Sequence, residues 1–193
     1  DNSRHLVTEA IEKIKSLSEK EGMSGVPSGF KDVDQITSGW QNSDLIIIAA
    51  RPGMGKTAFV LSMARNIAVT HQIPIGVFSL EMSSVQLIMR MISSETGIDS
   101  EKLRKAQLND QEWQQLYSKV KNLEDAPIYI DDTPSLSVFD LRAKCRRLVS
   151  QHKVKIIVVD YLQLMTAGGS GVGNREQEIS TISRSLKAIA KEL

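Results

Sequence analysis

The stretch that decides the fold occupies residues 45–57 and reads Leu45-Ile-Ile-Ile-Ala-Ala-Arg-Pro-Gly-Met-Gly-Lys-Thr57. It begins as an apolar run that is typical of a buried strand, and apolar residues at helical spacing follow it. A glycine loop between a strand and a helix is the context that a phosphate-binding loop requires. We therefore predict such a loop, although Ala50 stands where the usual pattern has glycine. The alternative, an ordinary Gly-Pro turn before a helix, explains the two flanking elements less well.

The residue types of this loop suit the binding of a nucleotide phosphate. Glycines allow the backbone to turn its N–H groups toward a phosphate, and the N-terminus of the following helix adds partial positive charge. Lys56 can reach the β- and γ-phosphates, and the Thr57 hydroxyl can bind Mg²⁺. The expected nucleotide-binding residues are Ala50, Arg51, Pro52, Gly53, Met54, Gly55, Lys56, Thr57 and Ala58.

Composition narrows the class of protein. The chain has 193 residues, enough for one α/β domain, and a net charge of +1, so any contact with nucleic acid must be local. Cys145 is the single cysteine, which excludes an internal disulfide and suits a reducing cytoplasm. The three histidines are scattered, so they imply no metal cluster. No apolar run approaches transmembrane length, and we expect no signal peptide and no membrane partner.

Strands and helices alternate along the chain. We expect strands at residues 45–49, 75–80, 128–130 and 155–160. We expect helices at residues 4–20, 30–36, 57–70, 83–96, 109–124, 137–152 and 174–192. The first and fourth strands are nearly all apolar, which is typical of strands buried on both faces of a parallel sheet. The predicted fold is therefore α/β, a mainly parallel sheet flanked by helices, with ligands at the carboxyl ends of the strands.

An amphipathic helix precedes this α/β pattern. Its apolar residues recur at helical spacing: Val7, Ile11, Ile14 and Leu17. A segment rich in Gly and Ser, residues 21–29, then interrupts it. The residues leave two interpretations open. Residues 1–24 form a linker helix and hinge before a domain at residues 25–193, or the helix packs on its own domain.

Carboxylates end three of the predicted strands. Asp160 ends the fourth, and its desolvation would be costly without a partner such as a Mg²⁺ ion shared with Thr57. Glu81 ends the second and could deprotonate the water that attacks a γ-phosphate, although an acid at a helix N-terminus is the alternative. For Asp131 and Asp132, which end the third, we favour a solvated turn.

Three stretches together resemble the bacterial replicative DNA helicases of the DnaB family. They are Ala50-Arg-Pro-Gly-Met-Gly-Lys-Thr57, Ser79-Leu-Glu-Met-Ser83 and Val158-Val-Asp-Tyr-Leu-Gln-Leu-Met165. Two further stretches fit as well, namely Gly25-Val-Pro-Ser-Gly-Phe30, with Asp34 and Gly39 after it, and Gly173-Asn-Arg-Glu-Gln-Glu-Ile179. The resemblance thus covers nearly the whole chain.

The resemblance implies a RecA-like P-loop ATPase motor in a ring-shaped homo-hexamer. Such a motor hydrolyses ATP with Mg²⁺, translocates on single-stranded DNA and unwinds duplex at the replication fork. By the match, Glu81 is the catalytic glutamate, Lys56 acts on the phosphates, and Thr57 and Asp160 hold the metal. The family also implies a linker helix at the start, primase and a helicase loader as primosome partners, and a motor that continues past residue 193 to a glutamine sensor and an arginine finger.

A loop rich in glycine, residues 168–173, precedes the last helix. The resemblance favours a loop in the channel of the ring, where it would touch a phosphate backbone. The alternative is a plain connection between the fourth strand and the last helix. The candidate DNA-binding residues are Gly171, Gly173, Asn174 and Arg175.

Three other functions remain open from the sequence. A RecA-like recombination or repair ATPase would share every nucleotide-site residue, and the family-like stretch at residues 174–179 favours the helicase over it. A phosphotransferase of the P-loop kinase type would need an acceptor pocket, to which no feature of the sequence points. A nucleotide-dependent interaction module would bind ATP without useful hydrolysis.

Overall fold

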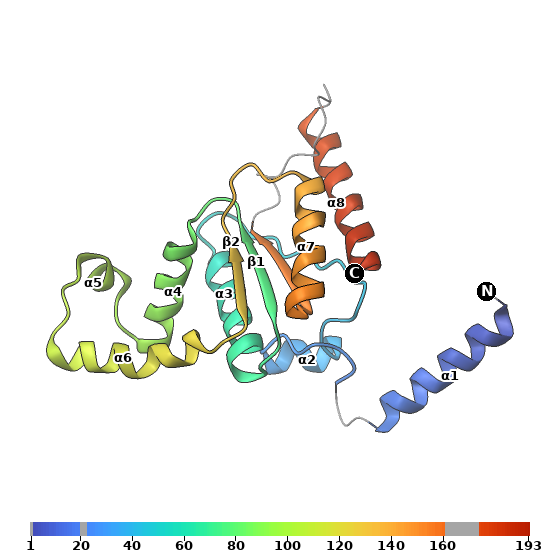
Figure 1. Ribbon diagram of the computed structural model, residues 1–193, viewed down its shortest axis with the longest axis horizontal. Coiled ribbons are helices and arrows are strands. Elements are labelled where there is room, and N and C mark those ends of the chain that lie inside the picture. The colour runs from blue at the N-terminus through green and yellow to red at the C-terminus, as the bar shows by residue number, and fades with distance from the viewer. Residues whose placement is uncertain (1, 20–22, 161–173) are drawn as a thin grey trace. The chain divides into compact units, whose positions relative to one another are not determined.

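Three parallel strands form the sheet of this α/β protein, in the order β2 (Ile128–Asp131), β1 (Ile75–Ser79) and β3 (Ile156–Asp160). β1 lies in the middle and pairs with both neighbours, and Ser79 is the register partner of Asp160. The structure is a computed structural model that describes residues 2–19, 23–160 and 174–193. The predicted α/β fold with a parallel sheet and flanking helices is confirmed (Figure 1).

The chain divides into two compact units, Asp1–Asn42 and Ser43–Leu193. The first holds α1 (Ser3–Glu19) and α2 (Lys31–Thr37), and the second holds the sheet. The helices of the second unit are α3 (Lys56–Arg65), the π-helix η1 (Asn66–Thr70), α4 (Ser84–Thr96), α5 (Ser100–Lys105), α6 (Asp110–Glu124), α7 (Val138–His152) and α8 (Arg175–Glu192). The expected helices are therefore present, and α5 is one that the sequence pattern did not predict.

The main core lies between one face of the sheet and the helices α7 and α8. Phe78 of β1 is buried there against Leu141 and Cys145 of α7 and Ile182 of α8. Gly76 faces α7, and a Cβ atom at Gly76 would stand 2.9 Å from the Leu148 Cδ1 atom of that helix. The absence of a side chain at this position allows α7 to approach the sheet closely.

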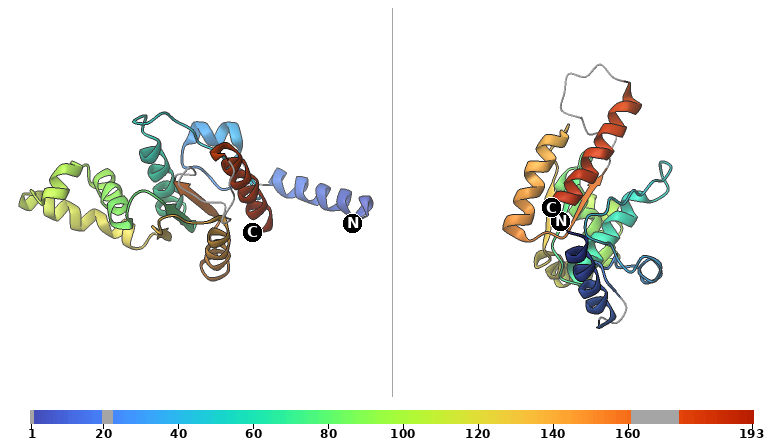
Figure 2. Two further views of the ribbon diagram at one scale, coloured as in Figure 1. Left: turned by 90° about the horizontal axis from the view of Figure 1, so that it is seen from above. Right: turned by 90° about the vertical axis from the view of Figure 1, so that its right-hand side faces the viewer.

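The opposite face of the sheet is covered by α3, as Figure 1 and the left view of Figure 2 show. Ile67 and Ala68, where α3 passes into η1, are completely buried, and so is Ile75 at the start of β1. Because helices lie on both faces, the carboxyl edge of the strands is the place where a ligand of such a sheet would bind. The helix α3, which follows the glycine loop, begins at this edge.

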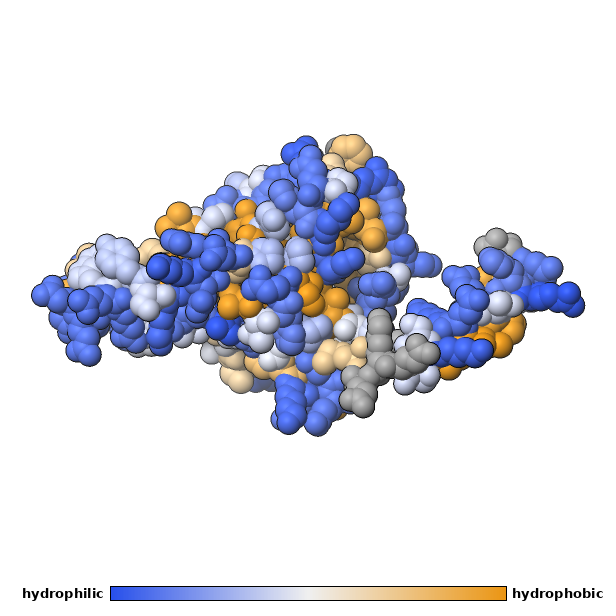
Figure 3. All heavy atoms as spheres, turned by 60° about the horizontal axis from the view of Figure 1, so that its bottom comes forward, coloured by the Kyte–Doolittle hydropathy of each residue, from blue (hydrophilic) through white to orange (hydrophobic). Residues whose placement is uncertain are grey.

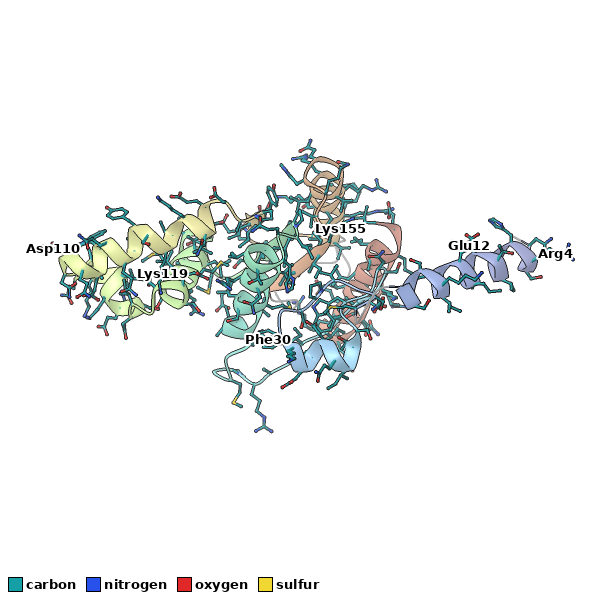
Figure 4. The ribbon with its side chains drawn as sticks, turned by 90° about the horizontal axis from the view of Figure 1, so that it is seen from below. Arg4, Glu12, Phe30, Asp110, Lys119 and Lys155 are labelled. Atoms are coloured by element: carbon teal, nitrogen blue, oxygen red, sulfur yellow. The ribbon has the colours of Figure 1, made fainter. Side chains whose placement is uncertain are left out.

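The helix ends follow the signals in the sequence. Asn109 caps α6, which begins at Asp110 (Figure 4): the Asn109 Oδ1 accepts a 2.8 Å hydrogen bond from the Glu112 N–H, and the Glu112 side chain accepts in return from the Asn109 N–H. Gly97 ends α4 with a left-handed φ of 73°, a conformation that glycine adopts without strain. The predicted start of α6 and end of α4 are thereby confirmed.

The predicted first strand, residues 45–49, is wrong for this chain. The structure gives these residues no strand pairing, and the Ile47 side chain is 67% exposed. A strand that is apolar at every position is stable only when both of its faces are covered. The three isoleucines at positions 46–48 all remain exposed, so this cover is lacking in the described chain.

The first unit is organised around a buried carboxylate. The Asp34 Oδ1 atom of α2 accepts hydrogen bonds from the Ser28 N–H at 2.8 Å and from the Ser28 hydroxyl at 2.7 Å. An antiparallel bridge joins Val26 to Trp40 within the same unit. One small folded unit with α2 therefore contains Asp34 and residues 25–30, which belong to the stretches that resemble the family.

The predicted amphipathic helix is present as α1. Its apolar side chains form a stripe on an otherwise hydrophilic helix (Figure 3), and Val7 and Ile14 are 56% and 65% exposed. Across the described ranges, none of the helices combines the length and apolar character needed to cross a membrane.

Candidate nucleotide-binding site

The glycine loop turns sharply before α3. Gly53 and Gly55 both have a φ of 78°, and the Met54 N–H donates a 3.2 Å hydrogen bond to the Arg51 carbonyl. Gly55 is the N-cap residue of α3 and has no side chain that could accept a hydrogen bond from the first N–H groups of this helix. These N–H groups, together with the positive end of the helix dipole, form an arrangement that suits an anion. The loop residues 50–55 and Ala58 are exposed.

Three side chains meet beside this loop. The Thr57 Oγ1 donates a 3.4 Å hydrogen bond to the Asp160 Oδ2, and the Lys56 Nζ lies 3.8 Å from the Asp160 Oδ1. The Asp160 side chain is 14% exposed, while that of Lys56 is 29% exposed. An ammonium, a hydroxyl and a carboxylate thus converge where α3 begins and β3 ends.

The donors at this point fit a magnesium ion bound together with a nucleotide. A hydroxyl and one carboxylate are hard oxygen ligands, and Mg²⁺ usually takes one or two such ligands from a protein and the rest from phosphates and water. Among the residues that the structure describes, no three His, Cys, Asp or Glu side chains gather into a metal site of their own. A cation here would depend on Asp160, Thr57 and the nucleotide.

Glu81 lies two residues beyond the end of β1. The preceding residue, Leu80, donates its N–H to the Asp160 carbonyl at 2.9 Å, so the loop with Glu81 begins beside the end of β3. The Glu81 side chain is exposed, and the following Met82 N–H is held by the Ser79 hydroxyl at 3.2 Å. The carboxylate is therefore accessible to a ligand, on a loop whose backbone is fixed on both sides.

Asp131, the last residue of β2, and Asp132, the next residue, have more partners than the sequence pattern indicates. Asp132 Oδ2 accepts a 2.8 Å hydrogen bond from the Ser84 N–H, and this bond holds the pKa of the Asp132 carboxyl below its usual value. Partial burial acts to raise the pKa of Asp131, but hydrogen bonds from Lys144 and Thr133 outweigh it and leave that pKa lowered. The predicted solvated turn therefore describes these two aspartates only in part, because both side chains also accept hydrogen bonds from other residues of the protein. The sequence signal that could have indicated these contacts is a pair of consecutive carboxylates at the end of a strand, beside the start of a helix.

Of the four candidate DNA-binding residues, Gly171 and Gly173 lie outside the described residues. The Asn174 Oδ1 accepts a 2.8 Å hydrogen bond from the Gln177 N–H and so caps α8. Arg175 forms a 3.0 Å ion pair with Glu178 on the same helix. The predicted role of these residues in DNA binding stays a prediction.

Known proteins are similar to this chain in sequence and in fold. A model of the family described as "DnaB-like helicase C terminal domain" matches residues 25–193. The replicative DNA helicase DnaB of Geobacillus stearothermophilus is 47% identical over the whole of this chain, and the replicative DNA helicase DnaC of Bacillus subtilis is 43% identical over the same length. The chain spans 42% of the length of each of these two relatives.

Two solved structures have the same architecture. A DnaB-like replicative helicase, studied with its interactions with primase, superimposes with a TM-score of 0.85 at 32% identity, over 100% of this chain and 46% of that one. The second is the structure of an ATPase domain, which superimposes with a TM-score of 0.88 at 31% identity, over 99% of this chain and 67% of that one.

Proposed function

Because the chain belongs to the DnaB-like helicase C-terminal domain family, we propose that it supplies the RecA-like ATPase motor of a replicative DNA helicase. The observation that carries the proposal is the meeting of Lys56, Thr57 and Asp160 at the carboxyl edge of the sheet, beside a glycine loop that leads into α3. In this proposal the chain hydrolyses ATP, and the released free energy drives movement along single-stranded DNA and the unwinding of duplex at the replication fork.

Each side chain of the site has a distinct task in this reaction. Lys56 stabilises the charge that develops on the transferred phosphoryl group, and the N–H groups of the glycine loop (residues 50–58) hold the phosphates. Thr57 and Asp160 would hold Mg²⁺, which would neutralise charge on the phosphates when it is bound. The contact between Thr57 and Asp160 supports this pairing, because the ligands of one ion must lie side by side.

Glu81 is the proposed general base. Its exposed carboxylate follows Leu80, and the hydrogen bond from the Leu80 N–H to the Asp160 carbonyl supports a base close to the proposed metal ligand. A carboxylate in this position can orient the attacking water and accept its proton. The hydrogen bonds of Leu80 and Met82 hold the backbone on either side of Glu81, which supports the role of this residue as a positioned base.

The proposed partners follow from the relatives. The DnaB-like helicase of solved structure is described with its interactions with primase, and we propose primase, a helicase loader and single-stranded DNA as partners of the whole protein. We further propose that it acts as a ring of six copies. The exposed apolar stripe of α1 supports an assembly in which residues 1–24 link one motor to the next, with residues 25–193 as the motor.

The test is ATP hydrolysis by the full-length protein, with and without single-stranded DNA, followed by unwinding of a forked duplex. Strong stimulation by DNA is expected, since a motor couples turnover to its track. A P-loop kinase would show no such stimulation, and a recombination ATPase would be stimulated without unwinding the fork. Hydrolysis that is insensitive to DNA, or stimulated hydrolysis without unwinding, would contradict the proposal.

A further inference from the structure

We propose that Asp132 is a positioning residue, which ties the start of α4 to the end of β2 and thereby holds the loop that carries Glu81. The Asp132 Oδ2 accepts a 2.8 Å hydrogen bond from the Ser84 N–H, across 48 positions of sequence. Ser84 is the first residue of α4 and follows Glu81 by three positions. The inference rests on the proposed function, because it concerns the step in which Glu81 acts on water.

Three alternate residues of this loop, Leu80, Met82 and Ser84, donate backbone N–H hydrogen bonds to acceptors at or near the ends of three different strands. The Leu80 N–H donates to the Asp160 carbonyl of β3 at 2.9 Å, and the Met82 N–H donates to the Ser79 hydroxyl of β1 at 3.2 Å. The hydrogen bond from the Ser84 N–H of α4 to Asp132, just after β2, is the third. Glu81 lies within this fastened stretch, so its main chain is fixed while its side chain stays exposed.

Local capping does not account for the contact with Asp132. Helix α4 already has a complete capping box, in which the Ser83 hydroxyl accepts from the Gln86 N–H at 3.2 Å and the Gln86 Oε1 accepts from the Ser83 N–H at 3.0 Å. What Asp132 adds is a link to another strand, and this link fixes where α4 begins relative to the sheet. A negative charge at a helix N-terminus also favours the helix itself, so the test must separate the two effects.

The last residue of β2 and the segment after it are themselves held by hydrogen bonds. The Lys144 Nζ of α7 donates to the Asp131 Oδ2 at 2.6 Å and to the Thr133 hydroxyl at 2.9 Å. The Asp131 Oδ1 also accepts from the Thr133 N–H at 2.9 Å. Asp132 is therefore held between two fixed neighbours, and its carboxylate can serve as a stable support for the start of α4.

The test compares three variants of the full-length helicase. Asp132→Ala removes the acceptor, whereas Asp132→Asn keeps an amide oxygen that can accept from the Ser84 N–H. Asn109→Ala is the matched control, because it removes an N-cap side chain from α6, a helix that does not follow the Glu81 loop. The readouts are kcat and KM for ATP with single-stranded DNA, and the melting temperature.

Loss of the hydrogen bond between Ser84 and Asp132 should misplace Glu81 without removing it. Small misplacements of reacting groups cost up to about 100-fold in rate. We expect kcat to fall about tenfold in Asp132→Ala, with KM changed less than about twofold, and to recover in Asp132→Asn. Asn109→Ala should lower the melting temperature and leave kcat unchanged. An unchanged kcat in Asp132→Ala, or an Asp132→Asn variant as slow as Asp132→Ala, would overturn the inference.

Amide hydrogen exchange gives a reading that does not depend on hydrolysis. The amides of residues 80–84 should exchange faster in Asp132→Ala than in the wild type and in Asn109→Ala. The reason is the loss of one of their three hydrogen bonds, the one from the Ser84 N–H to Asp132. Equal exchange in all three proteins overturns the tether, whatever the hydrolysis assay shows. A wild type without DNA-stimulated hydrolysis would instead contradict the proposed function, so the two failures are distinguishable.

Discussion

Thr57 and Asp160 stand 103 positions apart in the sequence, and the Thr57 hydroxyl donates a hydrogen bond to the Asp160 carboxylate at 3.4 Å. The other oxygen of this carboxylate faces Lys56 at 3.8 Å. The first two residues of α3 thus contact the last residue of β3, each at its own oxygen atom. Asp160 therefore contacts both other residues, and the predictions for this site start from these two contacts.

Replacement of Lys56 by alanine should abolish hydrolysis in the full-length enzyme. The loss of an electrostatic clamp on developing charge costs ~10²-fold or more in rate. Turnover is measured by phosphate release in the presence of single-stranded DNA. Lys119→Ala is the control, because it removes an exposed lysine from α6 (Figure 4) and should leave turnover unchanged. A Lys56→Ala enzyme with near-normal turnover would show that this lysine does not act on the phosphates.

Glu81→Gln should preserve binding of the magnesium nucleotide and remove most turnover. The amide keeps the size of the side chain but cannot accept the proton of the attacking water. Nucleotide affinity is measured by titration with a fluorescent ATP analogue, and turnover is measured in parallel. If affinity falls together with the rate, Glu81 is a structural or metal-linked residue.

Asp160→Asn should behave differently from Glu81→Gln. This substitution removes the charge that faces Lys56 and weakens a ligand of the proposed Mg²⁺ site, so both rate and magnesium-dependent nucleotide binding should fall. The measurement is the same titration at several magnesium concentrations. An affinity that is lowered equally with and without magnesium would argue against a metal ligand at this position.

Removal of residues 1–20 should lower the assembly state of the protein and leave the α/β unit folded. Val7, Ile11 and Ile14 are exposed on α1, and a single amphipathic helix of this length is marginal in water without a partner. Sedimentation velocity at a fixed concentration and circular dichroism decide the question. Unchanged assembly with a large loss of thermal stability would mean that the helix packs on its own domain.

The Cys145 thiol should react slowly with disulfide reagents at pH 8 in the native protein. Burial raises its pKa to about 12, so the thiol stays protonated there, and only the thiolate attacks a disulfide. Unfolding in guanidinium removes the burial, lowers the pKa and should make the reaction fast. Rapid labelling of the native protein would show that α7 opens readily from the core.

Local features of this fold could be predicted from the sequence because their causes lie within a few residues. The cap at Asn109 and the helix stop at Gly97 depend on neighbours within one turn, and both are found where the pattern predicts them. The short helix α5 was missed, although the Asp99 side chain accepts from the Glu101 N–H at its start. With six residues, α5 is too short to show an apolar periodicity.

Long-range features depended on the tertiary structure. The apolar run at residues 45–49 reads as a strand, yet pairing requires a partner edge and cover on both faces, which no local pattern supplies. Likewise, the sequence places Asp132 at the end of a strand but cannot say that its carboxylate meets Ser84. That contact exists because β1 and β2 run parallel and in register, which brings the ends of both strands to the same edge.

The sequence by itself determined which chemical groups are available at the candidate site, namely a glycine loop, Lys56, Thr57 and a carboxylate after an apolar strand. Only the tertiary structure decided which groups meet. The pairing of β1 with β3 sets Ser79 opposite Asp160, and the loop that carries Glu81 begins beside the end of β3, where the Leu80 N–H donates to the Asp160 carbonyl. Residue types set what a group can do, whereas strand order and register set what it can reach.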